Sequence, residues 1–166
     1  MDRQTKAEKR IGVFPGSFDP ITVGHIDIIK RASAIFDTLY VAVSDNIEKK
    51  YLFDLGTRCR FARESLQEFE NVIVTSSDVL TAEFARAVGA LSLVKGVRSV
   101  KDFEDERRQA DINYALGGAE TILLFSRPEY SYISSSLIRE LLKYGKPVDK
   151  FVSPYIFEEI LRLTKK

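Results

Sequence analysis

The only histidine of the chain, His25, lies in a segment whose residue types are suited to binding phosphate. This segment begins at Val13 and leads from an apolar stretch through two prolines and two glycines to a predicted helix. Gly16 allows the main chain to approach a ligand closely, and free amides at a helix N-terminus attract anions. The positive end of the helix dipole favours a neutral histidine unless an anion compensates. Beside a bound polyphosphate, His25 could donate a hydrogen bond to developing negative charge.

A second interpretation gives His25 a purely structural role. Thr22 and His25 are three residues apart, so both lie on one side of the first helical turn. The histidine could therefore cap its own helix. The loop from Pro15 to Pro20, which includes the hydroxyl of Ser17, favours the phosphate site over this alternative.

Three other polar segments follow predicted strands, so they should gather at one edge of a sheet. Lys49 lies in a polar loop, where a lysine is usually just solvated. Lys95 and Arg98 flank a glycine, where they could bind phosphate or be surface charges at a helix entry. The serines from Ser134 to Ser136 open a helix, so their hydroxyls could cap it, hold a phosphate, or do both.

Several other functions lack support in the sequence. The formal net charge is +1, which gives no bulk electrostatic basis for binding nucleic acid or an anionic membrane. The common phosphate loops G-x-x-x-x-G-K-[ST] and G-x-G-x-x-G are absent. One cysteine, Cys59, excludes an internal disulfide and fits a reducing compartment, and no Cys/His cluster predicts a metal site. We therefore expect a cytoplasmic protein.

Apolar strands alternate with amphipathic helices along the 166 residues. This alternation predicts right-handed crossovers and a parallel sheet. The expected fold class is α/β, a single Rossmann-like domain with a five-stranded parallel sheet and helices on both faces. Residues 1–9 are predicted to form a flexible leader and residues 10–166 the domain, with Thr57 as the N-cap of the second helix. We predict strands at 10–14, 39–43, 72–75, 91–94 and 121–125, and helices at 24–36, 57–69, 80–88, 100–116, 134–144 and 154–163.

Several motifs together resemble the nucleotidyltransferase superfamily with the (H/T)xGH signature. TVGH at 22–25 matches that signature, and ISSSLIR at 133–139 matches its ISSxxxR-like partner. KGVR at 95–98 lies between them. The combination of PGSFDP, DFE and EYSYISSS narrows the resemblance to the bacterial phosphopantetheine adenylyltransferases, over about residues 10–163.

The resemblance implies an enzyme that transfers the adenylyl group of ATP to 4'-phosphopantetheine, the penultimate step of coenzyme A biosynthesis. The acceptor's phosphate would attack the α-phosphorus of Mg-ATP, giving dephospho-coenzyme A and pyrophosphate. Such a phosphate needs no general base, so catalysis consists mainly of aligning two polyanions and offsetting their repulsion. Mg²⁺ is the implied cofactor, dephospho-coenzyme A or coenzyme A the implied product or feedback ligand, and a homohexamer the implied assembly.

The resemblance also implies roles for individual residues. The implied catalytic residues are His25, which would stabilise the transition state, with Ser17, Lys49 and Arg98. The implied acceptor-binding residues are Ser17, Lys49, Thr81 and Lys95. The implied ATP-binding residues are Ser17, Phe18, His25, Gly96, Val97, Arg98, Glu106, Tyr130, Ser131, Tyr132, Ile133, Ser134, Ser135 and Ser136.

The chain departs from the family pattern at a few positions. Lys95 stands where arginine is usual, which removes a bidentate hydrogen-bonding group. Tyr51 stands in place of a common proline, just after Lys49.

Two other functions are alternatives to this one. The first is a related nucleotidyltransferase that acts on nicotinamide mononucleotide or a phospho-alcohol. The second is a non-catalytic nucleotide-binding or regulatory module, against which the presence of His25, Ser17 and Arg98 argues.

Overall fold

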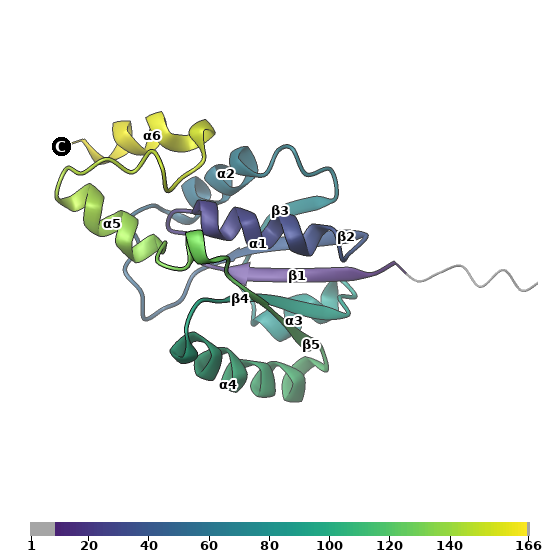
Figure 1. Cartoon of the computed structure of the whole chain (residues 1–166). Helices are drawn as coiled ribbons and strands as arrows, with labels where there is room; N and C mark the ends of the chain where they lie inside the picture. Colours follow the sequence, from purple (N-terminus) through teal and green to yellow (C-terminus); the bar gives the residue numbers. More distant parts are fainter. Residues whose placement is uncertain (1–8, 166) are drawn as a thin grey trace, which may run out of the picture.

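The computed structural model describes residues 9–165, in which five parallel strands form one sheet (Figure 1). The strand order is β3-β2-β1-β4-β5, so the expected α/β fold is confirmed. Most of the predicted leader, residues 1–8, lies outside the described residues. The strands β1 to β5 are Ile11–Gly16, Thr38–Ser44, Val72–Ser77, Ser92–Val97 and Glu120–Phe125. The helices α1 to α6 are Val23–Ser33, Leu55–Ser65, Thr81–Ala87, Val100–Gly117, Ser135–Lys143 and Pro154–Thr164, with a 3-10 turn η1 at Pro128–Tyr130.

The sheet is covered on both faces, which explains why its central strands are almost continuously apolar. The larger core joins the sheet to α1, α2, α5 and α6, and includes Val41, Phe61 and Ile138. The smaller core lies on the other face, where Ala85 of α3 packs with Leu93. Figure 1 shows α1 in front of the sheet near β2, α2 and α6 toward the top of the view, and α3 and α4 near β4 and β5 at the bottom. None of the helices in residues 9–165 combines the length and apolar character needed to cross a membrane.

The direction in which successive strands are added to the sheet reverses at its central strand, β1. Strand β1 pairs with β2 on one side and with β4 on the other. The chain therefore builds β2 and β3 in one direction and then crosses back to add β4 and β5. In open parallel sheets, ligands bind at the carboxyl ends of the strands beside such a reversal. The ends of β1 and β4 meet this condition.

Three strands, β1, β3 and β4, extend two or three residues farther at their carboxyl ends than the sequence predicted, and β3 does so through Ser76 and Ser77. Strand β1 continues through Pro15 and Gly16, and β4 continues from Lys95 to Val97. Neighbouring strands provide the pairing, since Pro15 lies opposite Ala42 and Lys95 opposite Leu123. Lys95 therefore belongs to a strand and not to the loop that follows it.

Three helix ends differ from the prediction by two residues or more, and one of them is the end of α2, which lies at Ser65 and not at Phe69. Asp54, not Thr57, is the N-cap of α2, because this helix begins at residue 55 and Thr57 is its third residue. The Asp54 carboxylate accepts a hydrogen bond of 2.8 Å from the Thr57 main-chain N–H. Helix α1 ends at Ser33, so Phe36 lies in the turn before β2. Phe36 is nevertheless buried, which is why its spacing resembled a helical pattern.

Candidate active site

A cavity of about 480 Å³ opens at the carboxyl ends of β1 and β4. Its volume is in the range of sites for small molecules and cofactors. Five basic and three acidic side chains line it, and this excess of positive charge suits an anionic ligand. The basic residues are Lys49, Lys50, Lys95, Arg98 and Arg139, and the acidic residues are Asp19, Asp102 and Glu106.

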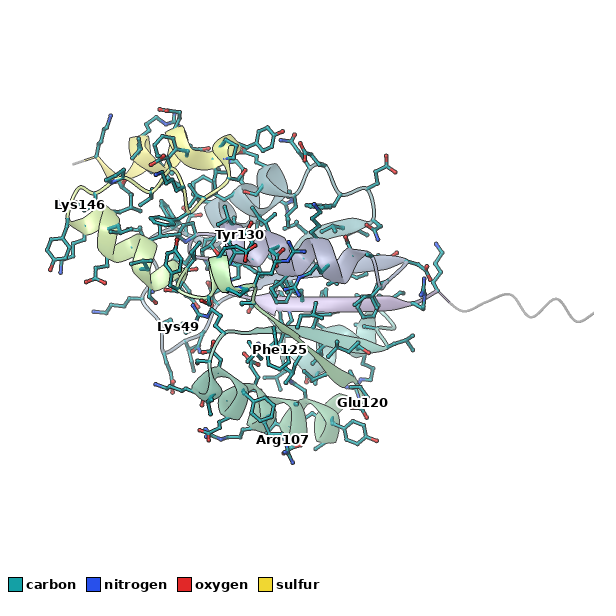
Figure 2. The ribbon with its side chains drawn as sticks, in the orientation of Figure 1. Lys49, Arg107, Glu120, Phe125, Tyr130 and Lys146 are labelled. Atoms are coloured by element: carbon teal, nitrogen blue, oxygen red, sulfur yellow. The ribbon has the colours of Figure 1, made fainter. Side chains whose placement is uncertain are left out.

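Most of the predicted site residues line this cavity. Figure 2 shows Lys49 and Tyr130, from segments far apart in the sequence, at the same end of the sheet. The residues brought together are Ser17, Phe18, His25, Lys49, Lys95, Gly96, Arg98, Glu106, Tyr130, Ile133, Ser134, Ser135 and Ser136. The lining does not include Thr81, Val97, Ser131 or Tyr132.

The loop after β1 has an unusual main-chain conformation. Phe18 has a φ of 49°, which is uncommon for a residue other than glycine. Its ring is buried edge-on against Phe14 and His25, at 5.6 and 5.1 Å between ring centroids. A methyl group at Gly16 would lie 2.8 Å from the Phe18 ring, so this packing requires the glycine. A ligand in the cavity would therefore contact the main chain of Phe18 and not its ring.

Thr22 caps α1 and orients His25 at the same time. The Thr22 hydroxyl accepts a hydrogen bond of 3.2 Å from the His25 main-chain N–H. The Thr22 main-chain N–H donates to Nδ1 of His25 at 3.1 Å, which completes a capping box. Because Nδ1 accepts, the hydrogen-bond network assigns the ring proton to Nε2. The capping role considered from the sequence is therefore present, and Nε2–H, which has no hydrogen-bond partner among residues 9–165, can donate to a ligand.

His25 is neutral near physiological pH. Burial lowers the pKa of His25 to about 4, and the positive charge of Arg98 adds to this effect. The neutral form was expected from the helix dipole, and the structure adds desolvation as the largest cause of the lowered pKa, followed by the charge of Arg98. A neutral imidazole with its proton on Nε2 is a fixed hydrogen-bond donor, the type of group that stabilises charge developing on phosphate oxygens.

Three basic side chains of the cavity pair with carboxylates: Arg98, Lys95 and Arg139, the last with Asp19 at 3.7 Å. The first two pairs are the closer ones. The Nε and main-chain N–H of Arg98 both donate to Oδ2 of Asp102 at 3.1 Å, and its Nη1 donates to the carbonyl of Ile133 at 3.1 Å. Nζ of Lys95 lies 3.1 Å from Oε2 of Glu106. These contacts orient both cations before any ligand binds, which lowers the entropy lost on binding.

The three serines at the start of α5 have different partners. Ser134 is the N-cap, through a hydrogen bond of 3.1 Å to a main-chain amide of the first turn. The Ser135 hydroxyl donates to the carbonyl of Pro20 at 2.8 Å, and the Ser136 hydroxyl accepts from Nη2 of Arg139 at 3.1 Å. One serine is sufficient as a cap, as expected, and Ser135 ties the helix to the loop after β1.

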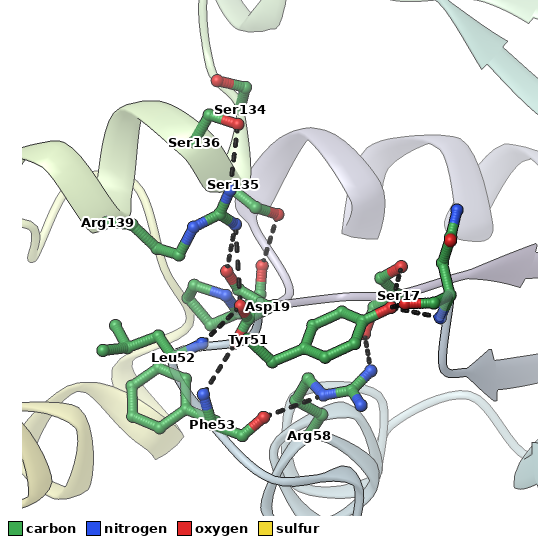
Figure 3. A network of polar contacts seen from close by, with 12 residues as sticks. Ser17, Asp19, Tyr51, Leu52, Phe53, Arg58, Ser134, Ser135, Ser136 and Arg139 are labelled. Carbon is green, nitrogen blue, oxygen red and sulfur yellow. Dashed lines mark hydrogen bonds and ion pairs between the residues drawn. The ribbon is translucent and has the colours of Figure 1, made fainter. Parts of the chain in front are cut away.

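Asp19, Tyr51 and Arg139 are among the residues that line the cavity and had no predicted role. Asp19 is buried, and its carboxylate accepts hydrogen bonds of 2.8 and 2.9 Å from the main-chain N–H groups of Leu52 and Phe53 (Figure 3). Nη1 of Arg139 donates to the carbonyl of Asp19 at 2.8 Å. Asp19 and Arg139 belong to motifs that the sequence had already singled out, and Tyr51 was noted only as a departure.

Comparisons with known proteins show the family to which this chain belongs. A family model described as cytidylyltransferase-like matches residues 13–141. The phosphopantetheine adenylyltransferase of Thermobifida fusca is 43% identical over 148 residues, which cover 89% of this chain and 90% of the relative. That of Caldanaerobacter subterraneus subsp. tengcongensis is 42% identical over 158 residues, covering 95% and 99%. The chain belongs to the phosphopantetheine adenylyltransferase family.

Membership of this family confirms the resemblance that the motifs predicted. A solved structure described as a putative nicotinate-nucleotide adenylyltransferase from Vibrio parahaemolyticus aligns with a TM-score of 0.71. The alignment covers 95% of this chain and 96% of that one at 19% sequence identity, so it supports the fold alone. Within residues 9–165, no group of three or more His, Cys, Asp or Glu side chains is placed to hold a metal ion.

Proposed function

We propose that the chain catalyses adenylyl transfer from ATP to 4'-phosphopantetheine. The observation that carries this proposal is the neutral His25 at the N-terminus of α1, with Nε2–H able to donate to a ligand, in a cavity rich in basic side chains. Relatives more than 40% identical over most of the chain have the corresponding name, which supports this acceptor.

The reaction is a displacement at phosphorus. An oxygen of the acceptor's phosphate forms a bond to the α-phosphorus of ATP, and the bond from that phosphorus to the bridging oxygen of the β-phosphate breaks. Pyrophosphate leaves with the electron pair, and dephospho-coenzyme A is the other product. Mg²⁺ enters as part of the Mg-ATP substrate and neutralises phosphate charge. The attacking oxygen is already anionic, so the chain has to align the two substrates and offset their repulsion.

The proposed roles of the side chains are those that the resemblance implies, and the presence of most of these residues in the cavity supports them. His25 donates from Nε2 to the charge that develops on the reacting phosphate. Ser17 and Lys49 hold the attacking phosphate, with Lys95 beside it. Arg98 holds the phosphates of ATP, together with the amides at the start of α5, whose N-terminus faces the cavity. Thr81 would contact the acceptor outside the cavity described above.

A panel of acceptors tests the function directly. Pyrophosphate release from Mg-ATP is measured with 4'-phosphopantetheine, nicotinamide mononucleotide and a phospho-alcohol as separate acceptors. We expect release with 4'-phosphopantetheine alone. Release with nicotinamide mononucleotide and none with 4'-phosphopantetheine would contradict the proposal, and release with none of the three would favour a binding module.

We also propose a cytoplasmic homohexamer that responds to coenzyme A as a feedback ligand. Helix α4 has no buried residue, and apolar side chains such as Val100, Phe103 and Leu116 are exposed. Exposed apolar patches of this kind mark interaction surfaces. Sedimentation should give a mass near six times the 18.8 kDa of one chain, and a monomer at micromolar concentration would contradict the assembly.

A further inference from the structure

Tyr51 occupies a position between the two segments proposed to hold the acceptor's phosphate. It follows the loop of Lys49 and lines the cavity. Its ring covers the guanidinium group of Arg58, with 4.0 Å from the guanidinium carbon to the ring centroid. Arg58 is completely buried, so the ring has a fixed support. Figure 3 shows the ring of Tyr51 beside Arg58, with its hydroxyl directed toward Ser17.

The hydroxyl of Tyr51 is in contact with both segments. It accepts a hydrogen bond from the main-chain N–H of Asn46. Its single proton has two acceptors within reach, the Ser17 hydroxyl at 3.4 Å and the Asn46 carbonyl at 3.5 Å. Both distances are long for hydrogen bonds between oxygens, so neither acceptor holds the proton firmly in the absence of ligand.

Asn46 connects this hydroxyl to the turn that carries Lys49. The Asn46 side-chain oxygen accepts a hydrogen bond of 2.9 Å from the main-chain N–H of Glu48. The Asn46 carbonyl accepts one of 2.9 Å from the main-chain N–H of Lys49. A hydrogen-bonded path therefore runs from the Lys49 turn through Tyr51 to the hydroxyl of Ser17.

Arg58 holds the other side of Ser17. Nη1 of Arg58 donates to the carbonyl of Ser17 at 2.7 Å and to the carbonyl of Ser44 at 3.1 Å. Its Nε donates to the carbonyl of Phe53 at 3.0 Å. Arg58 thus fixes the main chain of Ser17. Among residues 9–165, the side-chain hydroxyl of Ser17 has one hydrogen-bond contact that could orient it, the hydroxyl of Tyr51.

We propose that Tyr51 is a positioning residue for the acceptor's phosphate, an inference that depends on the proposed function. A phosphate can only accept hydrogen bonds, so Ser17 must turn its proton toward it. The Ser17 oxygen then accepts the proton of Tyr51, whose own oxygen accepts from Asn46. Each donor in this chain strengthens the next, and the long contact to Ser17 shortens. No covalent bond is made or broken in this step. The hydrogen bonds fix the position of Ser17 relative to the turn that carries Lys49.

Binding of two acceptors to the wild type and to Tyr51→Phe tests this role. Tyr51→Phe keeps the ring on Arg58 and removes only the hydroxyl. Calorimetry with 4'-phosphopantetheine should show affinity lowered about three- to tenfold, the usual effect of one hydrogen bond. Pantetheine, which lacks the phosphate, should bind both proteins equally. The KM for 4'-phosphopantetheine should rise by the same factor while the KM for ATP stays unchanged.

Tyr155→Phe is the matched control, because its hydroxyl also hydrogen-bonds a side chain, Glu68 at 2.9 Å, but lies outside the cavity. It should bind both acceptors as the wild type does, and both variants should unfold within about 4 °C of the wild type. Equal affinity of wild type and Tyr51→Phe for 4'-phosphopantetheine would overturn the inference alone. A loss of affinity for pantetheine as large as that for 4'-phosphopantetheine in Tyr51→Phe would also overturn it. A wild type that neither binds nor adenylylates 4'-phosphopantetheine would overturn the proposed function, and this inference with it.

Discussion

The main-chain N–H of Thr22 lies 3.1 Å from Nδ1 of His25, and this hydrogen bond decides which ring nitrogen carries the proton. A residue that caps its own helix would ordinarily be regarded as structural. Here the cap occupies one nitrogen and leaves the other as a donor of fixed direction. The structural and the chemical role of His25 therefore depend on the same contact.

The ring state of His25 can be observed directly, because the chain contains one histidine. NMR of the ¹⁵N-labelled protein, without a histidine tag, should show the proton on Nε2. It should also show a pKa of about 4, since burial and Arg98 both disfavour the charged ring. Titration near 6.5, or a proton on Nδ1, would contradict the assigned network.

The lowered pKa of His25 also predicts how stability depends on pH. The pKa is about 4 in the folded protein and about 6.5 in the unfolded chain, so the unfolded state binds more protons between these values. The free energy of unfolding should therefore be fully retained above pH 6.5 and fall as the pH is lowered toward 4. Between pH 7 and pH 5 this loss should be about 1–2 kcal/mol, allowing for solvent in the cavity.

Urea denaturation of wild type and His25→Gln at these two pH values measures that contribution. The substitution removes the titrating group, so the difference in stability between the two proteins should change by this amount between pH 7 and pH 5. A difference independent of pH would show that His25 titrates alike in the folded and unfolded chains.

Removing the Thr22 cap should affect stability and turnover together. Thr22→Ala removes the side-chain acceptor of the α1 N-terminus, which should lower the free energy of unfolding by about 1 kcal/mol. It also loosens the start of the helix that holds the His25 ring, so kcat should fall. Thr22→Ser keeps the hydroxyl and should restore both values. Loss of stability with an unchanged kcat would show that other contacts orient the ring.

The buried guanidinium of Arg58 should be essential for stability. Arg58→Ala leaves the carbonyls of Ser17, Ser44 and Phe53 without this donor and creates a cavity, so we expect a loss of about 3 kcal/mol or more in denaturant unfolding. Arg60→Ala is the control on the same helix, because Arg60 is half exposed and pairs with Glu159 at the surface. It should change stability by less than about 1 kcal/mol. Equal effects of the two substitutions would contradict the role given to Arg58.

The sequence was sufficient to predict the sheet and most of the cavity lining, because both depend on local signals. Apolar runs between turn residues defined the strands, and the loops after them had to meet at one edge. The capping box of Thr22 and His25 was also predictable, since it depends on a spacing of three residues. The extension of β4 through Lys95 was not, because it depends on pairing with β5, which no local pattern specifies.

The contacts of Asp19, Tyr51 and Arg58 were beyond sequence reasoning for a related physical reason. The contacts of Tyr51 and Arg58 with Ser17, and that of Asp19 with Leu52, join segments more than 30 residues apart, so they exist only once β1 and β2 are side by side. Arg58 lies in a polar helix whose pattern gives no sign that this side chain is completely buried. Residues that hold the loops of a site in place are thus harder to predict than residues that line the cavity.

The most direct test of the proposed mechanism compares catalysis and ATP binding in His25→Ala. Pyrophosphate release that depends on 4'-phosphopantetheine is measured in the steady state, and the Kd for Mg-ATP is measured separately by calorimetry. If Nε2 of His25 acts mainly on charge that develops during transfer, kcat should fall by about 100-fold or more while the Kd changes by less than about threefold. Equal losses in kcat and in ATP affinity would contradict this account.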